Sequence, residues 1–164
     1  MRAAVALGSN LGNRRRWLEL ALSLLDLPVV GVSSIYDTAP VGPVAQGRFL
    51  NAVAVVETSP DPVGLLARML AVERALGRRR LVAKGPRTVD LDLLLMEQPV
   101  SGEPWVTLPH PEIGRRAFVL VPLLEVWPRE EVPISEEVMA ECLKDAPSLY
   151  RVSPADWFPP QRWS

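Results

Sequence analysis

Two aspartates, Asp90 and Asp92, stand two residues apart at the start of the apolar run in TVDLDLLLM. On a β-strand, residues two apart point to the same face, roughly 7 Å from each other. Two such carboxylates repel unless a cation lies between them, and oxygen ligands of this kind suit Mg²⁺. The pattern favours a metal site on one strand face. An exposed, salt-bridged pair at a strand edge is the alternative, because D-x-D alone is a weak signal.

A cluster of cations comes just before this pair. Its members are Arg78, Arg79, Arg80, Lys84 and Arg87. Arginine binds phosphate oxygens through two parallel hydrogen bonds, and Gly85 and Pro86 restrict the backbone ahead of Arg87. A solvated basic loop is the plain alternative, but both charge signs meet at one place, as a polyphosphate with Mg²⁺ requires. The sequence contains neither a Walker A motif nor G-x-G-x-x-G, so bound ATP would lack a glycine-rich cradle.

Further polar residues stand in two proline-bounded segments. His110, the only histidine, lies between prolines in TLPHP and rules out a multi-histidine metal site. It is either a half-buried loop residue or an imidazole held near phosphates. Arg115 and Arg116 follow it, and one of them could reach the same site.

Strand alternation in the segment FLNAV places Phe49 and Asn51 on one face and Leu50 on the other. An aromatic ring beside an amide suits a flat heterocycle, which would stack on the ring and hydrogen-bond to the amide. A core phenylalanine next to a turn asparagine is the alternative interpretation.

Composition sets the broad class of the protein. The 164 residues suit a single domain spanning 1–164, with 48% apolar and 23% charged residues. A net charge of -1 predicts no polyanionic partner. The single cysteine, Cys142, excludes an internal disulfide and favours a reducing compartment. Without a signal peptide or an apolar run of roughly 18 residues, we expect a cytoplasmic protein with no membrane partner.

Periodicity and turn residues predict the order β-α-β-β-α-β, followed by further helical segments. We expect strands at 2–7, 29–38, 49–58 and 89–96, helices at 14–27, 63–76 and 135–146, a helix or buried segment at 115–126, and an irregular tail at 147–164. This order is typical of a ferredoxin-like α/β (α+β) fold: a largely antiparallel sheet flanked by helices in a three-layer sandwich. Such folds host many functions, so the fold does not name the activity.

Five motifs occur in order along the chain: ALGSNLG, YDTAPVGP, FLNAV, GPRTVDLDLLL and LPHPEIGRRAFVLVPLLEV. Together they resemble the 6-hydroxymethyl-7,8-dihydropterin pyrophosphokinase family of folate biosynthesis. The resemblance runs from about residue 3 to about 128, and the segment 145–164 lies beyond it. It implies transfer of pyrophosphate from ATP to the pterin hydroxymethyl oxygen, with release of AMP, in a monomer or homodimer.

The resemblance also implies roles for individual residues. Catalysis would fall to Arg78, Arg87, Asp90 and Asp92, with two Mg²⁺ ions held by Asp90 and Asp92. ATP would contact Arg78, Arg80, Lys84, Arg87, Leu93, Thr107, His110 and Arg116. The pterin would contact Thr38, Val41, Phe49, Asn51 and Phe118, with Phe118 stacked on the ring face opposite Phe49. Loops 42–48 and 78–87 would close over both substrates.

Two positions depart from the family pattern. The loop before GPR is one residue shorter and carries Lys84 as its cation, and Trp105 stands where some members have arginine. Two other functions fit parts of the sequence. A nucleic-acid-binding module could use the 78–87 arginine loop, but two carboxylates on the sheet argue against it. A D-x-D sugar transferase normally needs a larger nucleotide-binding domain.

Overall fold

The computed structural model describes residues 1–40, 46–77, 88–98 and 106–159. The helices are α1 (Arg14–Leu25), α2 (Pro62–Ala75), α3 (Ala117–Val126) and α4 (Glu136–Leu143), with short 3-10 turns η1 (Arg129–Glu131) and η2 (Ala146–Ser148). The strands are β1 (Arg2–Ser9), β2 (Val29–Val32), β3 (Ile35–Thr38), β4 (Phe49–Glu57), β5 (Asp90–Met96) and β6 (Tyr150–Ser153).

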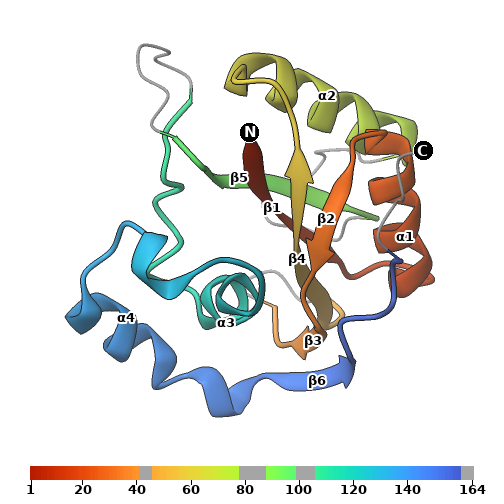
Figure 1. The fold of residues 1–164 in the computed structure, drawn as a ribbon. Helices are drawn as coiled ribbons and strands as arrows, with labels where there is room; N and C mark the ends of the chain where they lie inside the picture. Colours follow the sequence, from red (N-terminus) through yellow and green to blue (C-terminus); the bar gives the residue numbers. More distant parts are fainter. Residues whose placement is uncertain (41–45, 78–87, 99–105, 160–164) are drawn as a thin grey trace.

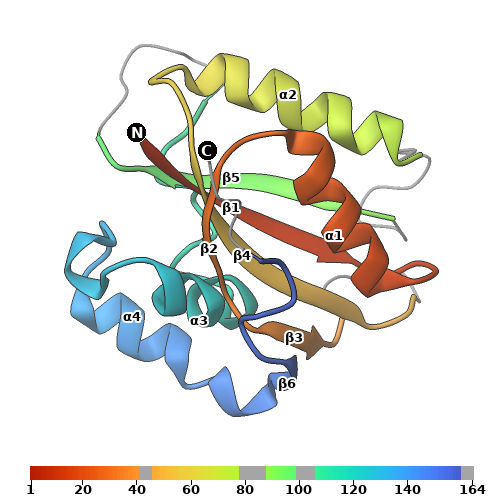
Figure 2. The same cartoon turned by 45° about the vertical axis from the view of Figure 1, so that its right-hand side comes forward.

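The six strands form one sheet in the order β5-β1-β4-β3-β6, and β2 also pairs with β4. Every pair of neighbouring strands is antiparallel. Helices α1 and α2 cover one face, and α3 and α4 cover the other (Figures 1 and 2). The predicted antiparallel three-layer α/β architecture is therefore confirmed.

Alternation along the strands divides the core into two parts. In β5, Leu91 and Leu93 pack on the side of α1 and α2, whereas Leu94 and Leu95 pack on the side of α3. Both leucines face α3 because the β1–β5 register shifts at this point. Before the shift, Asp90 and Asp92 alternate with Leu91 and Leu93, so both carboxylates lie on the α3 face, as the sequence predicted.

Helix α1 begins after Asn13 and packs one amphipathic face against the core. The Asn13 side chain accepts a hydrogen bond from Arg16 N at 3.2 Å. Leu18, Ala21, Leu22 and Leu25 are buried, and Trp17 and Leu20 pack partly buried against the same core. Leu24 lies outside this face and is 48% exposed. Asp26, with φ of 53°, ends the helix two residues earlier than predicted.

The prediction of one strand over 29–38 was wrong. Ser33 and Ser34 separate β2 from β3. Ser33 still bonds to β4, but it accepts Val53 N with its hydroxyl, and Ser34 donates its backbone N–H to Glu125 on α3 instead of to a strand. The prediction of an irregular tail was also wrong, since β6 pairs with β3 there. A four-residue strand with exposed side chains has no alternating apolar pattern from which to predict it.

The later helices begin or end at capping residues. Asp61 accepts from Gly64 N at 2.9 Å at the start of α2, and Gly77 follows that helix with φ of 81°. Ser135 accepts from Val138 N at 3.2 Å at the start of α4. The segment 115–126, predicted as a helix or buried segment, contains the helix α3. None of the described helices is long and apolar enough to cross a membrane.

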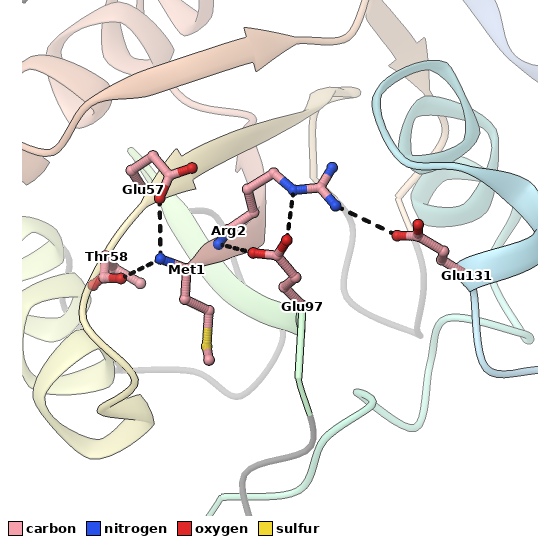
Figure 3. Close-up of polar contacts among 6 residues, drawn as sticks. All are labelled: Met1, Arg2, Glu57, Thr58, Glu97 and Glu131. Atoms are coloured by element: carbon pink, nitrogen blue, oxygen red, sulfur yellow. Dashed lines mark hydrogen bonds and ion pairs between the residues drawn. The ribbon is translucent and has the colours of Figure 1, made fainter.

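The N-terminal end of β1 is held by polar contacts (Figure 3). The Met1 ammonium lies 3.0 Å from Glu57 Oε2 and donates to Thr58 O. The Arg2 backbone N–H and side chain both contact Glu97, and the Arg2 guanidinium also lies 3.5 Å from Glu131 Oε2. These contacts lie at the opposite end of β1 from Gly8, the residue that pairs with Asp90.

Candidate active site

A pocket lies on the α3 face of the sheet, where β1, β4 and β5 meet the start of α3. Its lining residues are Ala6, Leu7, Gly8, Thr38, Ala39, Gln46, Phe49, Asn51, Ala52, Asp90, Asp92, Arg116, Phe118 and Val119. Seven residues named from the sequence thus come together here: Thr38, Phe49, Asn51, Asp90, Asp92, Arg116 and Phe118.

The floor of the pocket is made of small residues on β1. Gly8 pairs with Asn51 on one side and with Asp90 on the other, so it lies between the two polar groups. A Cβ atom at Gly8 would lie 3.1 Å from Asn51 Oδ1 and 3.7 Å from a ring carbon of Phe49. Glycine in a strand interior often marks a close approach of this kind. The sequence prediction missed Gly8 because GSN read as a turn.

One wall of the pocket presents an oriented amide. Asn51 Nδ2 donates to Thr38 Oγ1 at 2.6 Å, and Thr38 is buried. The two residues come from neighbouring strands, with Asn51 opposite Tyr36 and Phe49 opposite Thr38. Phe49 therefore stands beside a fixed hydroxyl and amide, an arrangement that suits an aromatic heterocycle with polar edges.

Arginine and phenylalanine from the start of α3 form the facing wall. Arg116 caps α3, and its guanidinium lies 5.7 Å from the Phe118 ring centroid. Its Nε also lies 3.2 Å from Glu112 Oε2, which restricts the guanidinium. Of the two arginines proposed as alternatives, Arg116 lines this pocket, and the exposed Arg115 lines an adjoining hollow instead.

His110 lies beside the acidic pair. Its backbone N–H donates to Leu94 O at 2.7 Å, which fixes the loop against β5. Its Nδ1 accepts from Glu112 N at 3.1 Å, so the neutral ring carries its proton on Nε2. That Nε2 lies 3.9 Å from Asp92 Oδ1, which brings a donor towards the carboxylate.

Three predicted ATP contacts in the described residues do not line the pocket, and one of them, His110, lies beside Asp92 instead. The Leu93 side chain is buried in the core beneath α1 and α2, on the face opposite Asp90 and Asp92. Only its backbone could serve a ligand on the α3 face. Thr107 is exposed in the loop before His110. Val41, Arg78, Arg80, Lys84 and Arg87, together with Trp105, lie outside the described residues.

Two further residues support the site and were not predicted. Asn10 Nδ2 donates to Gln46 Oε1 at 2.7 Å, which places the Gln46 side chain at the pocket. On the other side of β5, buried Glu73 accepts the Leu91 backbone N–H at 2.8 Å. Because β5 is an edge strand of the described sheet, the Glu73 carboxylate accepts a backbone N–H that a neighbouring strand would otherwise bind.

The acidic pair has the donor chemistry that Mg²⁺ prefers. Asp90 and Asp92 supply only oxygen, and no group of three or more ligating side chains occurs within the described residues. Mg²⁺ usually keeps several waters and binds through one or two carboxylates together with substrate phosphates. Two carboxylates beside an open pocket therefore fit a metal that arrives with a nucleotide.

The comparison with protein families agrees with this geometry. The model of 7,8-dihydro-6-hydroxymethylpterin-pyrophosphokinase (HPPK) matches residues 4–128. The chain belongs to this family. The match ends soon after α3, so α4 and β6 lie beyond it.

Individual relatives carry the corresponding names. The chain is 43% identical over 133 residues to a 2-amino-4-hydroxy-6-hydroxymethyldihydropteridine pyrophosphokinase of Bacillus subtilis, covering 79% of this chain and 80% of that one. It is 40% identical over 148 residues to the Pseudomonas aeruginosa protein of the same name, covering 86% and 91%. The crystal structure of an HPPK-DHPS in complex with substrates shares the fold, with a TM-score of 0.62 and 13% identity, over 88% of this chain and 43% of that one.

Proposed function

We propose that this protein transfers pyrophosphate from ATP to the hydroxymethyl group of 6-hydroxymethyl-7,8-dihydropterin, giving the pterin diphosphate and AMP in tetrahydrofolate biosynthesis. Membership of the HPPK family and relatives at about 40% identity support the proposal. The observation that carries it is a single pocket that joins a heterocycle-binding wall, Phe49 and Asn51, to the acidic pair Asp90 and Asp92.

The pterin half of the site consists of two rings and one polar pair. Phe49 and Phe118 line the same pocket from β4 and α3, so the pterin would lie between them. Because Asn51 Nδ2 donates to Thr38 Oγ1, Asn51 Oδ1 is turned towards other donors, such as the amino group of a pterin. Val41 is a further proposed contact that rests on the family resemblance alone.

The nucleotide half consists of Arg116, His110 and the acidic pair. Arg116 would bind phosphate oxygens, and His110 Nε2–H would donate to a phosphate oxygen beside Asp92. Arg78, Arg80, Lys84 and Arg87 remain proposed phosphate contacts, on the resemblance. Asp90 and Asp92 would hold Mg²⁺, which supplies neutralisation of phosphate charge when bound.

In the reaction, the pterin hydroxymethyl oxygen forms a bond to the β-phosphorus of ATP. The bond from that phosphorus to the α–β bridging oxygen breaks, AMP leaves, and the hydroxyl proton is released. Phosphoryl transfer leaves little covalent chemistry to the protein, so positioning and charge stabilisation carry the rate. Arg116 stabilises negative charge, and the two aromatic rings orient the hydroxymethyl group.

The test is to incubate the protein with ATP, Mg²⁺ and the hydroxymethyl pterin, and to identify the nucleotide product. We expect AMP, together with the pterin diphosphate. ADP would mean ordinary phosphoryl transfer, and the absence of any product would leave a binding protein as the better interpretation. Removal of Mg²⁺ by a chelator should abolish turnover, and added Mg²⁺ should restore it.

Asp92→Asn should lower kcat by at least about a hundredfold, in the range typical of lost electrostatic stabilisation of the transition state. Its melting temperature should stay near that of the native protein, because Asp92 is 45% exposed. Glu97→Gln is the matched control, since it removes an exposed carboxylate just beyond β5 and away from the pocket. Full activity in Asp92→Asn would disprove the metal assignment.

A further inference from the structure

The break between β2 and β3 is held by side chains from distant parts of the chain. Ser34 donates its backbone N–H and its hydroxyl to the two oxygens of Glu125 on α3, at 2.9 and 2.8 Å. Trp157 donates its indole N–H to Ser33 O at 2.8 Å, across 124 residues of sequence. Both serines are buried, so these contacts satisfy backbone groups that water does not reach.

Trp157 belongs to the C-terminal segment beyond the family match. Its ring is buried in the core beside α1 and α2, 6.1 Å from the Phe158 ring in an edge-to-face arrangement. The segment enters through β6, which lies beside β3, and then turns back towards α1 (Figure 2). The end of the chain thus makes two contacts here: β6 pairs with the edge of β3, and Trp157 bonds to Ser33, two residues before β3 begins.

These contacts place β3 between two neighbours. On one side Tyr36 pairs with Asn51 of β4, and on the other it pairs with Arg151 of β6. Ser33 is also tied to β4, because its N–H donates to Val53 O and its hydroxyl accepts from Val53 N, both at 2.8 Å. The position of β3 relative to β4 is therefore influenced by contacts at Ser33, two residues before β3 begins.

Thr38, the last residue of β3, lines the pocket. Thr38 lies five residues after Ser33, and its hydroxyl accepts the Asn51 amide at 2.6 Å. A shift of Ser33 relative to β4 would move Thr38 along Asn51 and Phe49, because a short strand moves as a unit. A hydrogen bond made at Ser33 is thereby coupled to the geometry of the polar pair in the pocket.

We propose that Trp157 is a positioning residue for the pterin half of the site. Its indole N–H fixes Ser33 and, through β3, sets the hydrogen bond between Thr38 and Asn51. The proposal rests on the pterin-binding role given to that pair above. It predicts a larger effect on the pterin than on ATP, because three of the four described nucleotide contacts, Asp90, Asp92 and His110, lie on β5 and the loop beside it, away from β3.

The test variant is Trp157→Phe, which keeps an aromatic ring and removes the N–H. We expect KM for the pterin to rise by about threefold to tenfold, the range given by one lost hydrogen bond. KM for ATP should change by less than about twofold on the same scale. A merely structural role would lower the melting temperature and leave both KM values unchanged, or raise both together, and either outcome would overturn the proposal.

Trp127→Phe is the matched control. Trp127 is also buried, but its indole N–H has no hydrogen-bond partner among the described residues. The same chemical change there should leave KM for the pterin unaltered. An equal rise in both variants would show a general effect of loosening the core, and would also overturn the proposal.

A second measurement needs no variant. Because coupling between sites is reciprocal, pterin binding should slow backbone hydrogen exchange in residues 33–38 and 150–157 of the native protein. Unchanged exchange there, with pterin bound, would overturn the proposal even if Trp157→Phe failed to fold. If the native protein neither binds nor turns over the pterin, the proposed function fails instead. The link between Trp157 and β3 can still be tested in that case. If backbone hydrogen exchange at 33–38 is the same in Trp157→Phe as in the native protein, Trp157 does not hold β3 and the positioning role is disproved.

Discussion

The pKa of Tyr36 depends on the packing of α3 against β3. Burial raises the pKa of the Tyr36 phenol above 10.0, and the nearby Glu125 carboxylate raises it further. The negative charge of Glu125 disfavours a second negative charge beside it, and the phenol hydrogen-bonds to that carboxylate. Tyr36 therefore reports on the same α3–β3 contact that holds Ser34.

The sequence contains two tyrosines, so Tyr36 can be titrated alone in a Tyr150→Phe protein. We expect the tyrosinate absorbance midpoint to lie above 10.0, and Glu125→Gln to lower it. The folded protein then holds the Tyr36 proton more tightly than the unfolded chain does, so the free energy of unfolding falls as the pH rises above 10. Urea denaturation should show a smaller fall in Tyr36→Phe. A midpoint below 10 would contradict the structure.

Gly8 shows how one missing side chain shapes the pocket. We expect Gly8→Ala to raise KM for the pterin by roughly tenfold, since overpacking typically costs about 1–3 kcal/mol. The added methyl would lie 3.1 Å from Asn51 Oδ1. Gly31→Ala, also in a strand, is the control because its Cβ would meet nothing within 4 Å. Steady-state kinetics of both variants should separate them, and equal KM values would argue against this pocket floor.

At the scale of elements, local signals place the helix starts well. Pro62 suits the first turn of a helix, and α2 does begin there, with the Asp61 carboxylate accepting from Gly64 N. The C-terminal end of α2 then contacts the start of β5, through Glu73 to Leu91 N and through Thr88 Oγ1 to Leu76 O. The helix thereby supports the strand that carries the acidic pair.

Asp61→Ala should lower the free energy of unfolding by about 1 kcal/mol, the usual cost of losing such a cap. Chemical denaturation measures this change. Asp61→Ser should recover most of the loss, because a serine hydroxyl accepts the same backbone N–H. The cap lies at the end of α2 remote from Glu73, so KM for ATP should be unaffected, and a large KM change would contradict the separation.

At the scale of the whole molecule, the sheet separates two polar regions. The contacts of Met1 and Arg2 lie at one end of β1 (Figure 3), and Gly8 at the other end lines the pocket. Arg2 also stacks over Trp127 at 4.9 Å. The exposed ion pairs of this cluster are screened by water and are expected to contribute little to stability.

Glu131→Gln should change the free energy of unfolding by less than about 0.5 kcal/mol, as is usual for an exposed surface position. Both KM values should also stay unchanged. Thermal melting and steady-state kinetics check these expectations. A marked loss of activity would show that the N-terminal end of β1 is coupled to the pocket and would contradict this prediction.

The sequence by itself determined the local features of the site. Alternation placed Asp90 with Asp92 and Phe49 with Asn51 on shared strand faces, and the motifs from residue 3 to 128 indicated the family. These features depend on neighbours within a few residues, where strand geometry and capping chemistry repeat in all proteins.

Only the tertiary structure decided which features meet. It placed Arg116 rather than Arg115 at the pocket, turned Leu93 away from it, and made Gly8 the floor. It also added β6 to the sheet and brought Trp157 to Ser33. These outcomes depend on pairings between segments far apart in sequence and on close packing of side chains, for which the chain has no local periodic signal.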